Sequence, residues 1–210
     1  MIHFVLRLWL ADRPGVLGKI ATAIGEVSGD VEAIDILERG GGQAIDEIVV
    51  ALPAPLAKEA LVAKLGLIEG LGIEDIRPIK PGHHDAGTAA LQSAANLVAT
   101  PRAQRLDHFC EQLRDLVDAT WAVALDRDEG RVLAAAGVVP DTGWLVAFFT
   151  GSAHLDLGDR HGSAPSDIVW ATLEPSRIAV AAGRHDRPFH FRERQRVALL
   201  GQIVGSTLND

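Results

Sequence analysis

The sequence predicts an α+β protein with two domains, and three features of its 210 residues indicate this. Stretches that alternate hydrophobic and polar residues, as strands do, are interspersed with stretches at helical spacing. Residues 80–88, KPGHHDAGT, are rich in Pro, Gly and His and are typical of a linker. Hydrophobic residues make up 48% of the chain, which suffices for a modest core on each side of that linker.

Residues 1–79 are predicted to follow the order strand, helix, strand, strand, helix, strand. The predicted strands cover residues 2–10, 31–38, 44–52 and 73–79. The stretch RGGGQ at residues 39–43 predicts a hairpin turn, because glycine adopts positive φ angles without strain. Hydrophobic residues at helical spacing predict a first helix, ended by Gly29 and Asp30, and a second one: Val16, Leu17, Ile20, Ala21, Ile24 and Val27, then Leu56, Leu61, Leu65 and Ile68.

Residues 89–210 follow a different order. A short helix over residues 89–99 is followed by a longer one with a single apolar face, formed by Leu106, Phe109, Cys110, Leu113, Leu116 and Val117. Four strands are predicted in TWAVALD, RVLAAAG, DIVWATL and RIAVAAGR. A helix over residues 143–150 and a polar loop over residues 151–166 separate the two pairs of strands, and FRERQRVALLGQIVGSTL forms a closing helix.

Composition limits where the protein acts and what it binds. The net charge of −8 excludes binding of duplex nucleic acid through the overall field. The one cysteine excludes a disulfide within the chain and fits a reducing compartment. The longest apolar runs fall far short of the roughly 20 residues of a membrane helix, and Arg7 interrupts the only stretch resembling a signal peptide. We therefore expect a cytoplasmic protein without a membrane partner.

The stretch LWLADRPGVLGKIA at residues 8–21 ends a strand and opens a helix at once. Asp12 is a suitable N-cap for that helix, and Pro14 suits a first turn because proline has no N–H group. Gly15 allows a close approach by a ligand or by another backbone. The remaining amide donors near Val16 and Leu17 predict a site for an anion such as a carboxylate. The alternative is an ordinary capped helix without a ligand.

Together with the order of elements, the stretch DRPGVLGKIA resembles an ACT domain, a regulatory module that senses amino acids. The resemblance covers residues 1–79 and implies a ferredoxin-like sheet with two helices on one face. It also implies a homodimer that pairs through the second strand, with an amino acid bound between the two chains. The binding residues implied are Asp12, Arg13, Pro14, Gly15, Val16 and Leu17 of one chain and Asp30, Val31 and Ile34 of the other.

Asp12 and Asp30 distinguish this chain from the serine-regulated dehydrogenases that carry the same module. The matching positions there hold amide side chains, whereas both are carboxylates here. Two acids complement the ammonium group of an amino acid. They also favour a basic or amine ligand, or a cation that bridges them, over serine. At an empty interface they would repel each other, so a ligand would control the stability of the dimer.

Residues 89–210 resemble a GAF-like sensor domain, related in shape to PAS domains. The stretches TWAVALDRDEGRVLAAAG and GRHDRPFHFRERQRVALLGQIVGSTL carry this resemblance. It implies an antiparallel sheet that binds a small molecule or mediates dimerisation. A covalently held bilin is not expected, because the polar loop contains no cysteine.

Other groups of residues have simpler interpretations. His154, Asp156, Asp159 and His161 could bind a metal, or Ser152 or Ser163 could serve a hydrolase, but a solvated loop explains them better. The arginine-rich residues 184–196 fit a solvated first helical turn better than a phosphate site. We expect Cys110 to be an inert core residue, and the four tryptophans to form core or pocket walls: Trp9, Trp121, Trp144 and Trp170.

The sequence therefore predicts a non-enzymatic regulatory protein, with no catalytic residues, metal or cofactor. An amino acid or similar metabolite is expected at an ACT homodimer interface. The GAF-like domain is expected to serve dimerisation, second-ligand sensing or output to a protein partner. The alternatives are a metal-dependent or hydrolytic enzyme that uses the 151–166 loop, and a dimerisation scaffold that binds no ligand.

Overall fold

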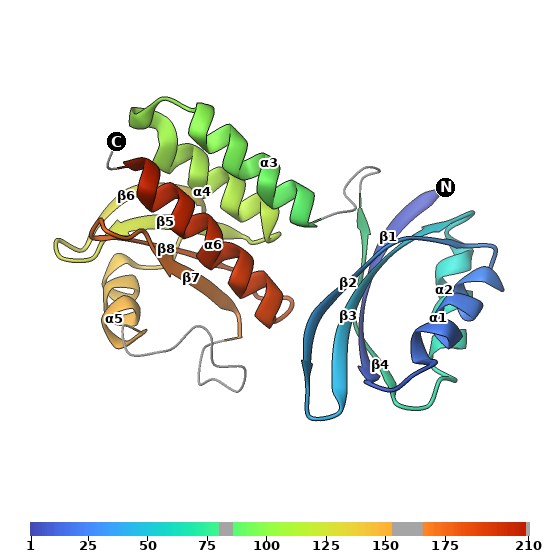
Figure 1. Ribbon diagram of the computed structural model, residues 1–210. Helices are drawn as coiled ribbons and strands as arrows, with labels where there is room; N and C mark the ends of the chain where they lie inside the picture. The colour runs from blue at the N-terminus through green and yellow to red at the C-terminus, as the bar shows by residue number, and fades with distance from the viewer. Residues whose placement is uncertain (80–85, 153–165, 209–210) are drawn as a thin grey trace. The chain divides into compact units, whose positions relative to one another are not determined.

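The computed structural model describes residues 1–79, 86–152 and 166–208 (Figure 1). The chain divides into two compact units, unit 1 (Met1–Asp85) and unit 2 (Ala86–Asp210). Each contains one antiparallel four-stranded sheet with helices against it, so the protein is α+β as predicted. None of the described helices is both long and apolar enough to cross a membrane.

Unit 1 has the predicted order of elements. They are β1 (Ile2–Ala11), α1 (Val16–Gly25), β2 (Asp30–Gly40), β3 (Gln43–Leu52), α2 (Leu56–Leu65) and β4 (Leu71–Ile79). The sheet order is β2-β3-β1-β4, and both helices cover the same face of the sheet (Figure 1). This is the ferredoxin-like arrangement that the sequence predicts.

Side chains point alternately to the two faces of the sheet, and this alternation determines which residues of unit 1 lie in its core. Leu6 and Leu8 of β1 and Ile48 of β3 face the helices and lie in the core. The core side of α1 consists of Val16, Ile20, Ala23 and Ile24. This helix is shorter than predicted: it ends at Gly25 rather than at Gly29 and Asp30, and Ser28 already has a left-handed φ of 58°.

Within the described residues, unit 2 contains four α-helices, one 3₁₀ turn and the four strands of a second sheet. They are α3 (Ala86–Ala99), the 3₁₀ turn η1 (Arg102–Gln104), α4 (Arg105–Leu116), β5 (Trp121–Asp126), β6 (Arg131–Gly137), α5 (Thr142–Ser152), β7 (Ile168–Thr172), β8 (Ile178–Gly183) and α6 (Phe191–Leu208). The sheet order is β6-β5-β8-β7. Helix α3 begins at Ala86, so its first residues fall inside the predicted linker of residues 80–88.

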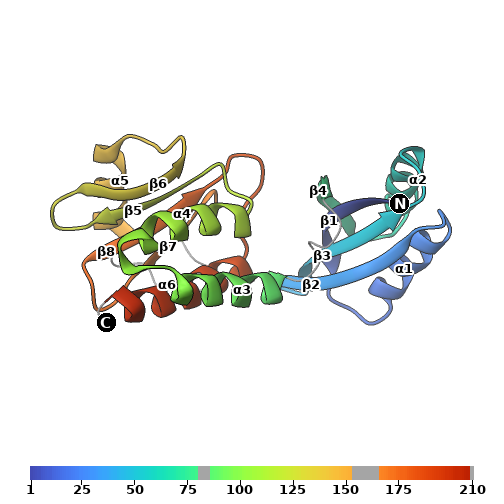
Figure 2. The same cartoon turned by 90° about the horizontal axis from the view of Figure 1, so that it is seen from above.

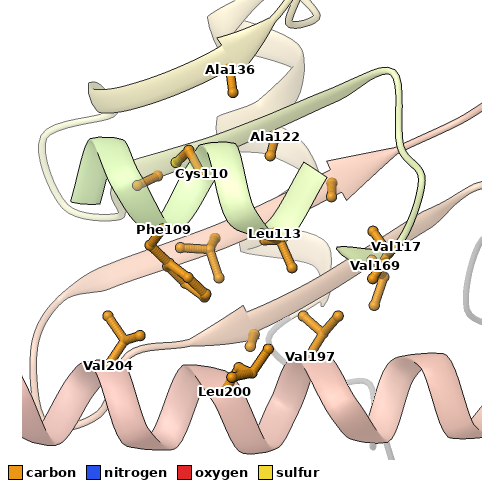
Figure 3. Close-up of a cluster of buried hydrophobic side chains, with 14 of the residues drawn as sticks. Phe109, Cys110, Leu113, Val117, Ala122, Ala136, Val169, Val197, Leu200 and Val204 are labelled. Carbon is orange, nitrogen blue, oxygen red and sulfur yellow. The ribbon is translucent and has the colours of Figure 1, made fainter. Parts of the chain in front are cut away.

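Hydrophobic side chains fill both faces of this second sheet. On one face, α4 and α6 contribute Phe109, Leu113, Val197, Leu200 and Val204 (Figure 3). Helix α5 covers the other face, opposite α3, α4 and α6 (Figure 2), with a core formed by Trp121, Val123, Leu125, Leu145, Phe149, Ile168, Trp170, Ala179 and Ala181. Cys110 lies in the first of these cores as predicted, where burial raises its pKa to about 12.

The tryptophans divide into two groups. Trp121 and Trp170 are buried, as predicted. The prediction is wrong for Trp9 and Trp144, which are both exposed. Trp9 lies on the face of β1 away from the helices and its indole N–H donates to Glu74 at 2.6 Å. Trp144 stacks on Phe148 near the surface of α5, with ring centroids 5.6 Å apart.

The arginine-rich stretch before α6 is not a solvated turn, and that prediction is wrong. The side chain of Arg184 is 1% exposed and forms two hydrogen bonds with Glu193, at 2.8 and 3.0 Å. It also donates to the carbonyl of Val117 at 2.6 Å and lies over the ring of Phe189. A guanidinium spreads five donors in one plane, so it joins several backbone turns that no apolar side chain could join.

Glu193 is expected to be essential for the stability of unit 2. Besides Arg184, its carboxylate accepts the amide of His190 at 2.9 Å, which is the reciprocal half of a helix-capping box. Glu193→Ala should lower the free energy of unfolding by about 3–5 kcal/mol, because it leaves a buried guanidinium without a counter-ion. Urea unfolding followed by circular dichroism measures this. Glu129→Ala, which removes an exposed ion pair with Arg131, should change little, and equal effects of the two variants would contradict the account.

Candidate functional site

The loop between β1 and α1 is tied to the neighbouring hairpin. The amide of Asp12 donates to the carbonyl of Gly42 at 2.9 Å, and the amide of Arg13 donates to Ala11 at 2.8 Å. The loop therefore has a defined course at the end of the sheet where β2 turns into β3. This places the start of the β1–α1 loop beside the hairpin.

The predicted capping role of Asp12 is wrong. Helix α1 begins at Val16, and its N-cap is Gly15, with a φ of 90° and no side-chain hydrogen bond to the helix. Pro14 and Gly15 lengthen the loop, so Asp12 lies too far before the helix to cap it. Its exposed carboxylate instead lies 3.9 Å from the Nε atom of Arg39.

The first turn of α1 retains unpartnered amide groups. The amide of Val16 reaches the carbonyl of Arg13 only at 3.5 Å. Within the described ranges, the amides of Leu17 and Gly18 donate to no protein acceptor. Uncapped amides of this kind carry a partial positive charge and attract an anion. The loop thus has the exposed carboxylate of Asp12 at its start and the amide donors of the helix at its end.

One chain does not bring the two predicted groups of ligand residues together. Ala11, next to the loop, pairs with Gln43, whereas Asp30 pairs with Ala51 at the far end of β3. The eight steps from Gln43 to Ala51 span about 27 Å at about 3.4 Å per residue. Val31 and Ile34 lie on β2 with Asp30, and Asp30 accepts the amide of Val31 at 2.9 Å.

Asp46 is a candidate residue that sequence reasoning missed. It pairs with Leu8 on one side and with Ile36 on the other, which places it on the helix-facing side of β3. The residue is 1% exposed, and its Oδ1 atom accepts no hydrogen bond in the described part of the chain. Its signal was present in QAIDEIVVAL: an acid occupies a core position of an alternating strand.

The surroundings of Asp46 disfavour its charge. Burial is the main cause that raises the pKa of this carboxyl, and the charges of Asp12 and Asp35 raise it further. The guanidinium of Arg39 opposes them without overcoming them. Asp46 therefore belongs electrostatically to the end of the sheet that carries the loop.

A second buried charge lies on the opposite face of the same sheet. Arg7 of β1 is buried and pairs with Glu47 of β3 at 2.7 Å. Arg77 of β4 approaches the same carboxylate at 3.4 Å and pairs with Asp75 at 2.7 Å. These charges satisfy one another, in contrast to Asp46.

The alternative site in the 151–166 loop lies largely outside the described residues. His154, Asp156, Asp159, His161 and Ser163 belong to that part of the chain, and the backbone of Ser152 closes α5. In the described ranges, no group of three His, Cys, Asp or Glu side chains is placed to hold a metal. An open groove between α3 and α4 is lined by Asn96, Ala99, Thr100, Pro101, Gln104, Asp107, His108 and Glu111.

Comparison with known proteins leaves the family open. No protein-family model matches the chain. No curated protein matches it either. Several solved structures are similar at low identity, among them the ACT domain of GTP pyrophosphokinase from Chlorobium tepidum, which is 14% identical with a TM-score of 0.31 and covers 38% of this chain and 100% of that one.

Two further solved structures are similar to parts of the chain. The GAF domain of phosphoenolpyruvate-protein phosphotransferase from Acinetobacter is 11% identical with a TM-score of 0.44, covering 58% of this chain and 91% of that one. The regulatory subunit of aspartate kinase from Thermus thermophilus, in its ligand-free form, is 22% identical with a TM-score of 0.33, covering 46% and 70%.

Gly15 should tolerate no side chain although there is space for one. A Cβ atom there would meet nothing within 4 Å, but its φ of 90° is unfavourable for any other residue. Gly15→Ala should lower the free energy of unfolding of unit 1 by about 1–2 kcal/mol. In the same helix, Gly18→Ala should raise it by up to about 1 kcal/mol, because alanine favours the helix. Urea titrations of both variants test this, and changes of the same sign would contradict it.

Asp46→Asn should stabilise the protein in a pH-dependent way. The pKa of Asp46 is higher in the folded state than in the unfolded state. The parent protein therefore loses stability as the pH rises from the unfolded pKa to the folded pKa, because the unfolded chain ionises this carboxyl more easily. The variant has no such cost. Its gain in free energy of unfolding should be small in acid, grow as the pH rises and level off above the folded pKa. Urea titrations of both proteins across this range measure the gain, and a gain independent of pH, or a loss at neutral pH, would contradict the assignment.

Proposed function

We propose that the protein is a non-enzymatic regulator that binds an amino acid, or a related small metabolite, at the β1–α1 loop of unit 1. The observation that carries this proposal is that the loop and the helix start it leads into carry groups of opposite charge. The unpartnered amides of Leu17 and Gly18 suit a ligand carboxylate, and the exposed carboxylate of Asp12 suits an ammonium group. A free amino acid offers both groups on a single carbon atom.

The site is completed by a second copy of the chain. β2 lies at the edge of its sheet, paired only with β3 within the described residues. An antiparallel second copy along this edge brings the partner subunit's Asp30 toward the hairpin that holds Asp12. Irregular pairing between Val31 and Ala33 and between Ile36 and Glu38 interrupts the strand, so contact between the copies is strongest over short stretches. This supports a dimer that a ligand tightens.

Unit 2 supplies dimerisation, a second ligand site or the output. Leu145 and Phe149 of α5 fill the sheet face that a ligand would otherwise occupy. Exposed hydrophobic side chains lie on α3 and α6, which pack on each other: Leu91, Val98, Leu199 and Ile203. Because α5 fills this sheet face, and because α3 and α6 carry exposed hydrophobic side chains, dimerisation or contact with a protein partner is favoured over a second ligand site. A ligand would regulate the protein by binding one arrangement of the dimer more tightly than another.

Thermal unfolding with each of the twenty amino acids tests this function. A ligand at a hundredfold its Kd should add about 2.7 kcal/mol of stability. Selective stabilisation by one amino acid or a few related ones is expected, and Asp12→Ala should weaken it. Asp141→Ala, in the loop before α5, is the control and should bind as the parent protein does.

Other outcomes favour other functions. Equal melting temperatures with all twenty amino acids would contradict the proposal and favour a scaffold that binds no ligand. Stabilisation by a divalent cation alone would favour the metal-dependent enzyme.

A further inference from the structure

Asp46 is the one buried carboxylate of unit 1 whose position no interaction within the described residues explains. Its Oδ1 atom is shielded from water and accepts no hydrogen bond. Buried polar atoms are almost always paired, so an exception calls for an explanation. Arg7 shows that unit 1 can pair a buried charge, since Glu47 meets it at 2.7 Å on the other face of the sheet.

The register places Asp46 close to the β1–α1 loop. Ala44, two residues earlier on β3, pairs with Leu10 of β1 and with Arg39 of β2. Asp46 is therefore one step further along the same face, two residues from Ala44 and about 10 Å from Gln43 at the strand end next to the loop. The charges of Asp12 and Arg39 both act on its carboxylate, which confirms their proximity. Asp12, Arg39 and Asp46 therefore form a cluster of charged residues. Asp12 and Arg39 are exposed, and Asp46 is buried.

We propose that Asp46 anchors a subsite for an organic cation, and that the ligand of unit 1 carries a second positive charge on an ammonium or guanidinium group. This rests on the proposed function, because the α-amino acid part of the ligand occupies the loop. A basic side chain then extends under the loop to Oδ1 of Asp46. The class of ligand is a basic amino acid or a closely related amine.

Arg39 supports this assignment. Its guanidinium influences Asp46 without a hydrogen bond to it, and its Nε atom lies 3.9 Å from Asp12. The chain thus places an exposed cation of its own near an acid without a hydrogen-bond partner for Oδ1 among the described residues. A ligand cation would have to compete with it, so removing the charge of Arg39 should tighten binding.

Pairs of amino acids that differ in one charge test the proposal. L-citrulline has nearly the shape of L-arginine without its charge, and L-norleucine is L-lysine without its terminal ammonium group. Calorimetric titration of the full chain should give at least tenfold tighter binding for the charged member of one pair. In Asp46→Asn this preference should disappear, whereas Arg39→Gln should enlarge it. Glu59→Gln, an exposed position on α2 that does not act on Asp46, is the control and should keep the preference.

The outcomes separate this proposal from the proposed function. Equal binding of charged and neutral members by the parent chain would overturn the subsite and leave the function standing, as would an unchanged preference in Asp46→Asn. If none of the four amino acids binds, cadaverine and agmatine test the subsite alone, and the panel of twenty amino acids decides the proposed function. Binding of either amine that Asp46→Asn abolishes supports the subsite. Binding of neither amine, or of a divalent cation only, overturns it.

Discussion

The pairing of β1 with strands on both of its edges determines the rest of unit 1. β1 pairs with β3 on one side and with β4 on the other, so its register cannot shift without disturbing both ladders. A shift by one residue would move Leu6 and Leu8 out of the core and expose them. The same register places Asp46 beside Leu8 on the covered face and Glu47 beside Arg7 on the opposite one. One constraint thus produces a satisfied charge on one face and an unsatisfied charge on the other.

The two units treat buried charge in different ways. In unit 2, Arg184 has a carboxylate and several carbonyls around it, and it joins the end of α4 to the start of α6. The hydrogen bonds of Arg184 therefore stabilise the fold of unit 2. Among the described residues, the charge of Arg39 is what offsets the burial of Asp46, and the raised pKa of this carboxyl shows that the offset is incomplete. Groups held in an unfavourable state are more often found at binding sites than in a scaffold, because a ligand can supply what the protein lacks.

Much of the fold could be predicted from the sequence, because alternation and helical spacing report directly on burial. The order of elements in unit 1 and the core face of α4 follow from them. Local chemistry was harder to predict. Asp12 has the right side chain for an N-cap, but the φ of Gly15 moves the helix start to Val16. A stretch rich in charged residues predicts that Arg184 and Arg187 are exposed to solvent. Only the tertiary structure shows that they are buried and form ion pairs with Glu193 and Asp118.

The candidate site was predictable only in part. The loop at Asp12 could be found because its residues are contiguous. Asp46 could not be linked to it, since its importance depends on strand register and on an absent hydrogen-bond partner. Asp30 lies at the other end of the sheet from the loop, so a ligand contact shared with the loop would require a second copy of the chain.

Amide hydrogen exchange of the full chain, measured by NMR, tests most directly whether the β1–α1 loop binds the ligand. The amides of Leu17 and Gly18 have no acceptor among the residues that the structure describes, so they should exchange quickly in the chain alone. Addition of an amino acid that raises the melting temperature should slow the exchange of these two amides selectively. Slower exchange elsewhere, with Leu17 and Gly18 unchanged, would place the ligand at another site and contradict the account.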